Sequence, residues 1–198
     1  MLIAVVSWTV VAALLITSSG LILNRDWRWE IGFLAAQYAG VFWLVFQHWP
    51  LGMAAAKLVG GWMAAASLGM TLLNLPQQPE PIEKYWTQGR TFYLFMIGMA
   101  TLLAVATAPL IESILPGIGI PVVVGAILLI AMGLLQLGTT TQVLRVILGL
   151  LTTLSGFEIL YAAMEGSSLV AALLVVVNLG LGLVGAYLLT ISAEEKTA

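Results

Sequence analysis

The sequence predicts an all-α integral membrane protein with about seven transmembrane helices. Of its 198 residues, 61% are hydrophobic and only 8% are charged, and the mean hydropathy is +1.07. A soluble domain usually carries about 25% charged residues, so this chain lacks the polar surface that water requires. In addition, its apolar residues fall into stretches of about 20 residues, the length at which a helix crosses a bilayer.

Seven apolar stretches take up nearly all of the chain. They cover residues 2–23, 31–49, 51–74, 91–111, 117–138, 142–164 and 168–191. The longest connection between them is PQQPEPIEKYWTQGR, from Pro76 to Arg90. Almost no sequence is left over for a separate soluble domain.

The positive charges predict the orientation, because Lys and Arg gather in the cytoplasmic connections of membrane proteins. With seven spans, six cations fall on the same side, and the connections on the other side contain no Lys or Arg. These cations are Arg25, Arg28, Lys84, Arg90, Arg145 and Lys196. We therefore expect the N-terminus outside and the C-terminus inside.

The last stretch contains a literal match to the dinucleotide-binding pattern G-x-G-x-x-G, at Gly180, Gly182 and Gly185. That fingerprint belongs to the turn between a strand and a helix, whereas these glycines lie inside an apolar span. We expect them to let another helix approach closely, and we expect no nucleotide to bind.

Composition also excludes several kinds of chemistry. The chain has no cysteine, which removes disulfides, thiolate metal sites and Cys-ligated iron–sulfur clusters. His48 is the single histidine, so one chain cannot supply both axial histidines of a b-type haem. The net charge is −2, which gives no basic patch for nucleic acid. Without a nucleophile–base pair or a phosphate loop, we expect no cofactor, no metal site and no enzyme activity of the chain alone.

Ionisable residues inside a span are costly and mark candidate functional sites. Glu158 lies well inside the sixth stretch, and Ser155 and Tyr161 lie three residues before and after it, near one helix face with Glu165. We expect Glu158 to exchange protons and this face to line a wet path to the outer surface, while Thr152 extends the face inward. The alternative is a protonated Glu158 bonded to a neighbouring subunit or to a backbone carbonyl.

Three further polar residues have alternative interpretations. Asn178 lies near the middle of the last stretch, where a buried amide bonds another helix. Lys57 lies some six residues into the third stretch; it either snorkels to the outer interface or is a buried amine in a proton relay. Arg145, at the start of the sixth stretch, is expected to anchor the topology.

The last three stretches resemble a known three-helix unit, the K subunit of bacterial respiratory complex I and the C subunit of Mrp-type cation/proton antiporters. RVILGLLTTLSGFEILYAAM resembles the second helix of that family, and ALLVVVNLGLGLVGAYLL resembles the third. The whole length resembles the E subunit of hydrogenase-4, including NLPQQP after the third stretch with Lys57 upstream. The resemblance implies residues 1–116 as a four-helix N-terminal segment, 117–191 as the three-helix unit and 192–198 as a short cytoplasmic tail.

The resemblance also implies a role in moving protons or sodium ions. The complex I subunit carries two glutamates in neighbouring helices, and here these positions fall on Leu151 and Asn178. Glu158 lies two turns after Leu151 on nearly the same face and is the candidate to replace it. Asn178 cannot carry a proton, so a relay would pass through water or use Glu158 with a partner.

The function expected from these features is that of a non-catalytic membrane subunit in a complex-I-like or antiporter-like complex, contributing to proton or cation translocation. Its partners would be larger antiporter-like membrane subunits and the lipid bilayer, in the inner (plasma) membrane or an equivalent energy-transducing membrane. The path would use Glu158, Asn178, Ser155, Tyr161 and Lys57. Two alternatives stay open: a purely structural scaffold subunit, and a small independent transporter, for which the sequence shows no repeat between 2–74 and 117–191.

The charge distribution makes the topology testable with reporter fusions. A reporter inserted at residues 48–50 is expected outside, and one inserted at residues 78–88 is expected in the cytoplasm, because only the second connection carries cations. Compartment-specific reporters such as an alkaline phosphatase and a fluorescent protein read this out. If both insertions report one compartment, the number of spans is wrong.

Overall fold

Seven α-helices form the part of the chain that the computed structural model describes, residues 2–75 and 89–197, and no strand occurs there. Each of these helices is long and apolar enough to cross a membrane, which confirms the predicted all-α fold of a multi-pass membrane protein. The helices are α1 (Leu2–Leu23), α2 (Trp27–Phe46), α3 (Leu51–Asn74), α4 (Arg90–Ile114), α5 (Ile120–Thr139), α6 (Val143–Met164) and α7 (Ser168–Thr197).

Helix α2 begins four residues before the apolar stretch that predicted it. Asp26 caps the helix, and its side chain accepts a hydrogen bond of 3.0 Å from the backbone N–H of Arg28. Such a cap satisfies one of the orphan donors of a helix start. Glu30 therefore lies in the first turn of α2 instead of in a loop, and only 2% of it is exposed.

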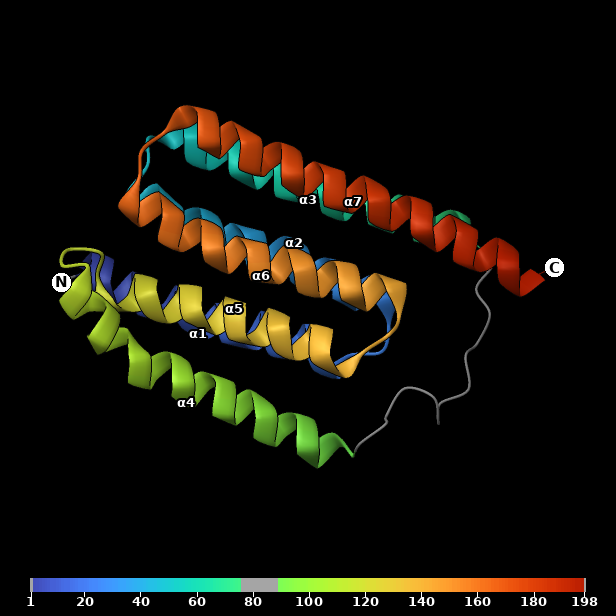
Figure 1. Ribbon diagram of the computed structural model, residues 1–198, viewed down its shortest axis with the longest axis horizontal. Helices are drawn as coiled ribbons and strands as arrows, with labels where there is room; N and C mark the ends of the chain where they lie inside the picture. The colour runs from blue at the N-terminus through green and yellow to red at the C-terminus, as the bar shows by residue number, and fades with distance from the viewer. Residues whose placement is uncertain (1, 76–88, 198) are drawn as a thin grey trace.

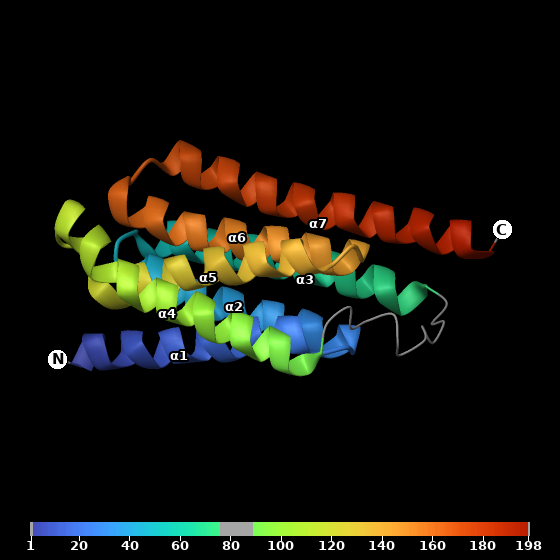
Figure 2. The same cartoon turned by 60° about the horizontal axis from the view of Figure 1, so that its bottom comes forward.

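The helices form two layers of three, with one helix at the edge (Figures 1 and 2). In the first layer α2 packs between α1 and α3, and in the second layer α6 packs between α5 and α7. Each helix of the first layer also contacts its counterpart in the second: α1 packs on α5, α2 on α6 and α3 on α7. Helix α4 connects the layers and packs mainly against α5.

Counterpart helices run in the same direction, because four connections separate them and successive helices alternate. The two halves, 2–74 and 120–197, thus repeat one order of helices although the sequence shows no repeat. Parallel repeats of this kind occur in several transporter folds. At the interface of the two layers, α2 and α3 of one layer pack against α6 and α7 of the other.

Burial follows the layers. Helix α5 is the most enclosed helix: 56% of the residues in its apolar 18-residue segment are buried. The same share for α4 is 22%. The outward side of α4 carries large exposed apolar residues, including Phe95, Leu102 and Leu110. Such a surface is suited to lipid rather than water, since soluble monomers rarely expose apolar patches larger than a few hundred Å².

The two termini lie at opposite ends of the bundle (Figure 1). The C-terminal end carries the arginines of the helix starts and connections, and we call it the arginine end; the other is the N-terminal end. The arginines there are Arg25, Arg28, Arg90 and Arg145. Lys84 and the side chain of Lys196 lie outside the described residues. The side of the membrane that each end faces stays a prediction.

Two of the three glycines in the nucleotide-like pattern lie at close helix contacts, as expected. A Cβ on Gly182 would lie 2.9 Å from Cα of Ala64 in α3, and one on Gly185 would lie 2.9 Å from the side chain of Ile147 in α6. Gly180 differs, because a Cβ there would meet nothing within 4 Å. The pattern is thus a packing surface of α7 inside this chain.

This packing predicts different effects of leucine at two neighbouring glycines. Gly182→Leu is expected to destabilise the protein by about 1–3 kcal/mol or more, because the added bulk pushes α7 away from the α3 backbone. Gly180→Leu is the matched control and is expected to change little, since it faces open space. Thermal unfolding in detergent measures both. Equal effects of the two variants would contradict the observed α3–α7 contact.

Candidate functional site

A buried ion pair joins the two layers of the bundle. Lys57 Nζ of α3 contacts Glu158 Oε2 of α6, and the side chains are 2% and 0% exposed. Lys57 lies six residues after the start of α3 and Glu158 six before the end of α6, so each is about 9 Å along its helix from the N-terminal end. The snorkelling interpretation of Lys57 is therefore wrong. The amine points into the bundle, because the carboxylate of Glu158 compensates its charge there.

An amide and a phenol complete the site. Asn178 Nδ2 of α7 donates a hydrogen bond of 2.8 Å to Glu158 Oε1. The hydroxyl of Tyr38 in α2 donates one of 3.1 Å to Asn178 Oδ1. Both residues are 1% exposed. The prediction that Asn178 bonds another helix is confirmed, and we call Tyr38, Lys57, Glu158 and Asn178 the central cluster.

Small residues of α3 make room for the cluster. Gly61 lies four residues after Lys57, on the same helix face, and a Cβ there would overlap the ring of Tyr38. A Cβ on Gly60 would lie 2.7 Å from the side chain of Val175 in α7. The two glycines therefore let α2 and α7 come close enough for Tyr38 and Asn178 to reach each other.

Further polar contacts follow the interface of α2 and α6 away from the cluster. Ser155 is fully buried, interacts with Tyr38, and donates a hydrogen bond of 2.8 Å to the Leu151 carbonyl. One turn further, Gln37 Nε2 donates a bond of 3.3 Å to Thr152 Oγ1. Both steps lead towards the arginine end.

A second ion pair lies at the end of this line. Arg145 Nη2 is 3.1 Å from Glu30 Oε1, and the side chains are 14% and 3% exposed. Arg145 also donates a hydrogen bond to the Asn24 backbone carbonyl, which ties α6 to the α1–α2 connection. Arg145 thus has a partner in addition to its expected anchoring position. We call the contacts Tyr38–Ser155, Gln37–Thr152 and Glu30–Arg145 the polar seam.

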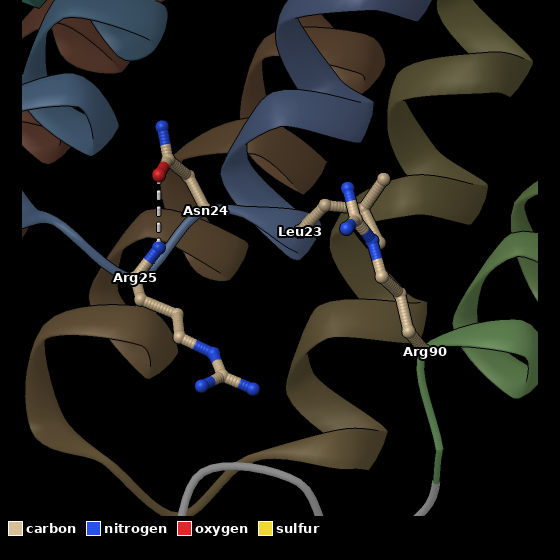
Figure 3. A pocket seen from close by; sticks show the side chains of 4 residues that line it. All are labelled: Leu23, Asn24, Arg25 and Arg90. Atoms are coloured by element: carbon tan, nitrogen blue, oxygen red, sulfur yellow. Dashed lines mark hydrogen bonds between the residues drawn. The ribbon is translucent and has the colours of Figure 1, made fainter. Parts of the chain in front are cut away.

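A surface cavity of about 510 Å³ lies beside this end of the seam, lined by Leu23, Asn24, Arg25 and Arg90. In Figure 3 the Arg90 side chain lies near Leu23, and the Arg25 backbone N–H donates to the Asn24 side chain. Asn24 therefore belongs both to the cavity wall and, through its carbonyl, to the surroundings of Arg145. The cavity thus places polar surface next to the end of the seam that lies at the arginine end.

The surroundings of the cluster are different towards the N-terminal end. Tyr161, placed by the sequence on a path from Glu158 to the outer surface, stacks on Phe157 and meets Trp49 edge-on. The Trp49 indole N–H donates a bond of 2.8 Å to the Glu165 carbonyl. The structure thus brings Glu158, Lys57, Asn178 and Ser155 together and places Tyr161 in an aromatic group beside them.

Sequence reasoning did not find Glu30, Gln37 and Tyr38. A signal existed for two of them, since the polar pair Gln37–Tyr38 interrupts the apolar run LAAQYAGV. Glu30 gave no such signal, because the hydropathy pattern put it outside the span. Its pairing with Arg145 depends on how α2 and α6 align, which neither segment shows by itself.

Comparisons with protein-family models, with curated proteins and with solved structures find no match to this chain. Within residues 2–75 and 89–197, no group of three or more His, Cys, Asp or Glu side chains could hold a metal ion.

The groups of the central cluster suit proton exchange. A carboxylate and an amine in contact can pass a proton directly, and in a low-dielectric interior the charged pair loses much of its advantage over the neutral one through desolvation. Asn178 holds one oxygen of Glu158 and leaves the other to Lys57. The amide and the phenol thus fix the orientation of the carboxyl, and Lys57 is the group that can take or return its proton.

The ion pair predicts strong coupling between two substitutions. Lys57→Met alone is expected to destabilise the protein by about 3–5 kcal/mol, because it leaves a buried carboxyl without its counter-charge. Adding Glu158→Gln should recover much of this loss, since no unpaired charge remains. A double-mutant cycle of thermal or denaturant unfolding measures the coupling. Purely additive effects would mean that the two side chains do not interact in the protein.

Proposed function

We propose that this chain is a non-catalytic membrane subunit that contributes to proton or cation translocation in a complex-I-like or antiporter-like complex. The observation that carries the proposal is the ion pair of Lys57 and Glu158, buried between the two layers of a membrane-spanning bundle. Ionisable residues at such positions are expensive, and in membrane proteins they mark ion pathways and proton relays.

A purely structural purpose accounts less well for this pair. Replacing a buried ion pair by well-packed hydrophobic residues is often neutral or stabilising, so packing alone gives no reason to keep it. The cluster also contains two further polar side chains: Asn178 bonds the carboxyl of Glu158, and Tyr38 bonds Asn178. An oriented carboxyl with an adjacent amine is what a proton relay requires.

The resemblance to the complex I and antiporter subunits supports the same proposal. In that family two glutamates in neighbouring helices serve the hydrophilic axis, and this chain has Leu151 and Asn178 at those positions. Here Glu158 would be the proton-carrying acid and Lys57 its partner from the N-terminal half. The second titratable group would thus come from α3.

A small independent transporter is the second candidate, and the arrangement of the helices favours it. Two layers of three helices repeat one order, and the central cluster lies between them. Transporters built from repeats hold their substrate sites at the repeat interface. Gentle purification distinguishes the candidates: large antiporter-like partners support the subunit, and a stable homo-oligomer supports the transporter.

The proposal predicts a loss of translocation when Glu158 can no longer titrate. Glu158→Gln is expected to lower the rate at least about tenfold, because the amide keeps size and hydrogen bonding but carries no exchangeable acid proton. Glu158→Asp should retain part of the activity, since a carboxyl remains with shorter reach. Proton or cation flux in vesicles, normalised to the amount of assembled complex, measures both variants.

Glu165→Gln is the matched control, because Glu165 follows the same helix but is exposed. It should leave the flux unchanged. Full activity of Glu158→Gln in assembled complex would overturn the proton-carrier role and leave a scaffold role for this subunit. In that case Glu158→Ala would still be harmful, since Asn178 would lose its acceptor.

A further inference from the structure

We propose that water reaches the central cluster from the arginine end alone, along the polar seam, and that the Glu30–Arg145 ion pair controls this access. The inference rests on the proposed function, because a proton-exchanging pair inside a bundle needs a route by which protons arrive. It adds the side from which they come and the residues at the entrance.

Two buried amides on helices that pack against α6, Gln37 of α2 and Gln136 of α5, indicate water beside α6. Among the described residues, the buried side-chain atoms without a hydrogen-bond partner include Gln37 Oε1 and Gln136 Nε2, whose side chains are 1% and 3% exposed, and also Trp43 Nε1 towards the other end of α2. Buried polar atoms without a protein partner are normally satisfied by ordered water. Gln37 is itself a member of the seam, through its bond to Thr152.

These amides lie where the seam needs bridging. Arg145 and Thr152 are seven residues apart, or about 10 Å along α6, which is too far for a direct hydrogen bond. Gly133 of α5 packs on Thr153 and Gly149 of α6, and Gln136 lies three residues closer to the arginine end. Gln136 is therefore level with the interval between Thr152 and Arg145.

The two ends of the bundle differ in what they offer water. At the arginine end, the seam reaches Arg145 and Asn24, and Asn24 lines the cavity (Figure 3). Towards the N-terminal end, Glu158 is followed by buried Ala162 and by Tyr161, which meets the buried Trp49 edge-on. The shorter distance to the surface thus passes aromatic and apolar side chains, whereas the longer distance carries the polar seam.

The Glu30–Arg145 pair is the last contact of the seam before Asn24, which lines the cavity. It joins α2 to α6, and the further bond of Arg145 to the Asn24 carbonyl holds the arginine in place. While the pair is closed, these side chains occupy the entrance. When it opens, the entrance widens and two charged groups become available to attract water.

Cysteine accessibility tests this access directly, and the chain contains no cysteine of its own. Thr152→Cys is expected to react with a charged, membrane-impermeant methanethiosulfonate only when the reagent is on the side of the arginine end. Thiols react as thiolates, which form in water and not in lipid or an apolar core. The full chain in its membrane is used, in vesicles of both orientations, with labelling read by mass spectrometry.

Ala162→Cys is the matched control on the same helix, because Ala162 is also buried, at 4% exposure. It lies two residues, about 3 Å, from the end of α6, whereas Thr152 lies nine residues, about 14 Å, from the start. If depth alone decided reactivity, Ala162→Cys would react faster. We expect it to stay unlabelled from either side.

Glu30→Ala tests the entrance. Combined with Thr152→Cys, it is expected to raise the labelling rate roughly tenfold, equivalent to about 1.4 kcal/mol less stability of the closed state. An unchanged rate would overturn control by the ion pair. Reaction from both sides, no reaction, or equal reaction of Ala162→Cys would overturn the one-sided access.

Ser155→Cys provides a second reporter in case Thr152→Cys misfolds, because it changes only one atom of the side chain. It lies one turn closer to the cluster, and we expect it to be labelled from the same side. The labelling result is independent of the flux of Glu158→Gln. Normal flux with one-sided labelling would refute the proton-carrier role and keep the access. Lost flux of Glu158→Gln, with Thr152→Cys and Ser155→Cys both unlabelled, would support the proton-carrier role and refute the access along the seam.

Discussion

The ion pair of Lys57 and Glu158 is the constraint on which the rest of the bundle depends. Either charge alone would cost several kcal/mol in a membrane interior, so the two side chains must meet, and they must be shielded from lipid together. This requires α3 and α6, which belong to different layers, to face each other with α2 and α7 closing the sides. The glycines of α3 and α7 are what allows four helices to come that close.

The parallel arrangement of counterpart helices explains why the contacts of the polar seam line up along α2 and α6. Glu30 and Gln37 are seven residues apart on α2, and Arg145 and Thr152 are seven apart on α6. Because the two helices run in the same direction, equal spacing places each residue level with its partner over two turns. Each of the two helices thus carries a stripe of polar residues. The partner helix shields this stripe from lipid at the interface of the layers.

The helices could be predicted from hydropathy, because lipid imposes one length and one chemical character on every span. Glu158 and Asn178 could be identified as well, since a polar residue in an apolar run is conspicuous by itself. The partner of Glu158 could not: Lys57 lies in another span, and periodicity fixes the face of a helix but not its alignment with a distant one. Glu30 was missed because a cap at Asp26 extends α2 beyond its apolar run.

The pairing of Lys57 with Glu158 has a consequence for how the protein enters the membrane. During synthesis α3 reaches the bilayer about 100 residues before Glu158 exists, an interval of roughly 5–20 s at usual translation rates. The amine has no counter-charge during that time, and its stem is long enough to hold it at the nearby interface. We therefore expect a stage of biogenesis in which Lys57 faces the headgroups, until the arrival of α6 brings Glu158 and the amine moves into the bundle.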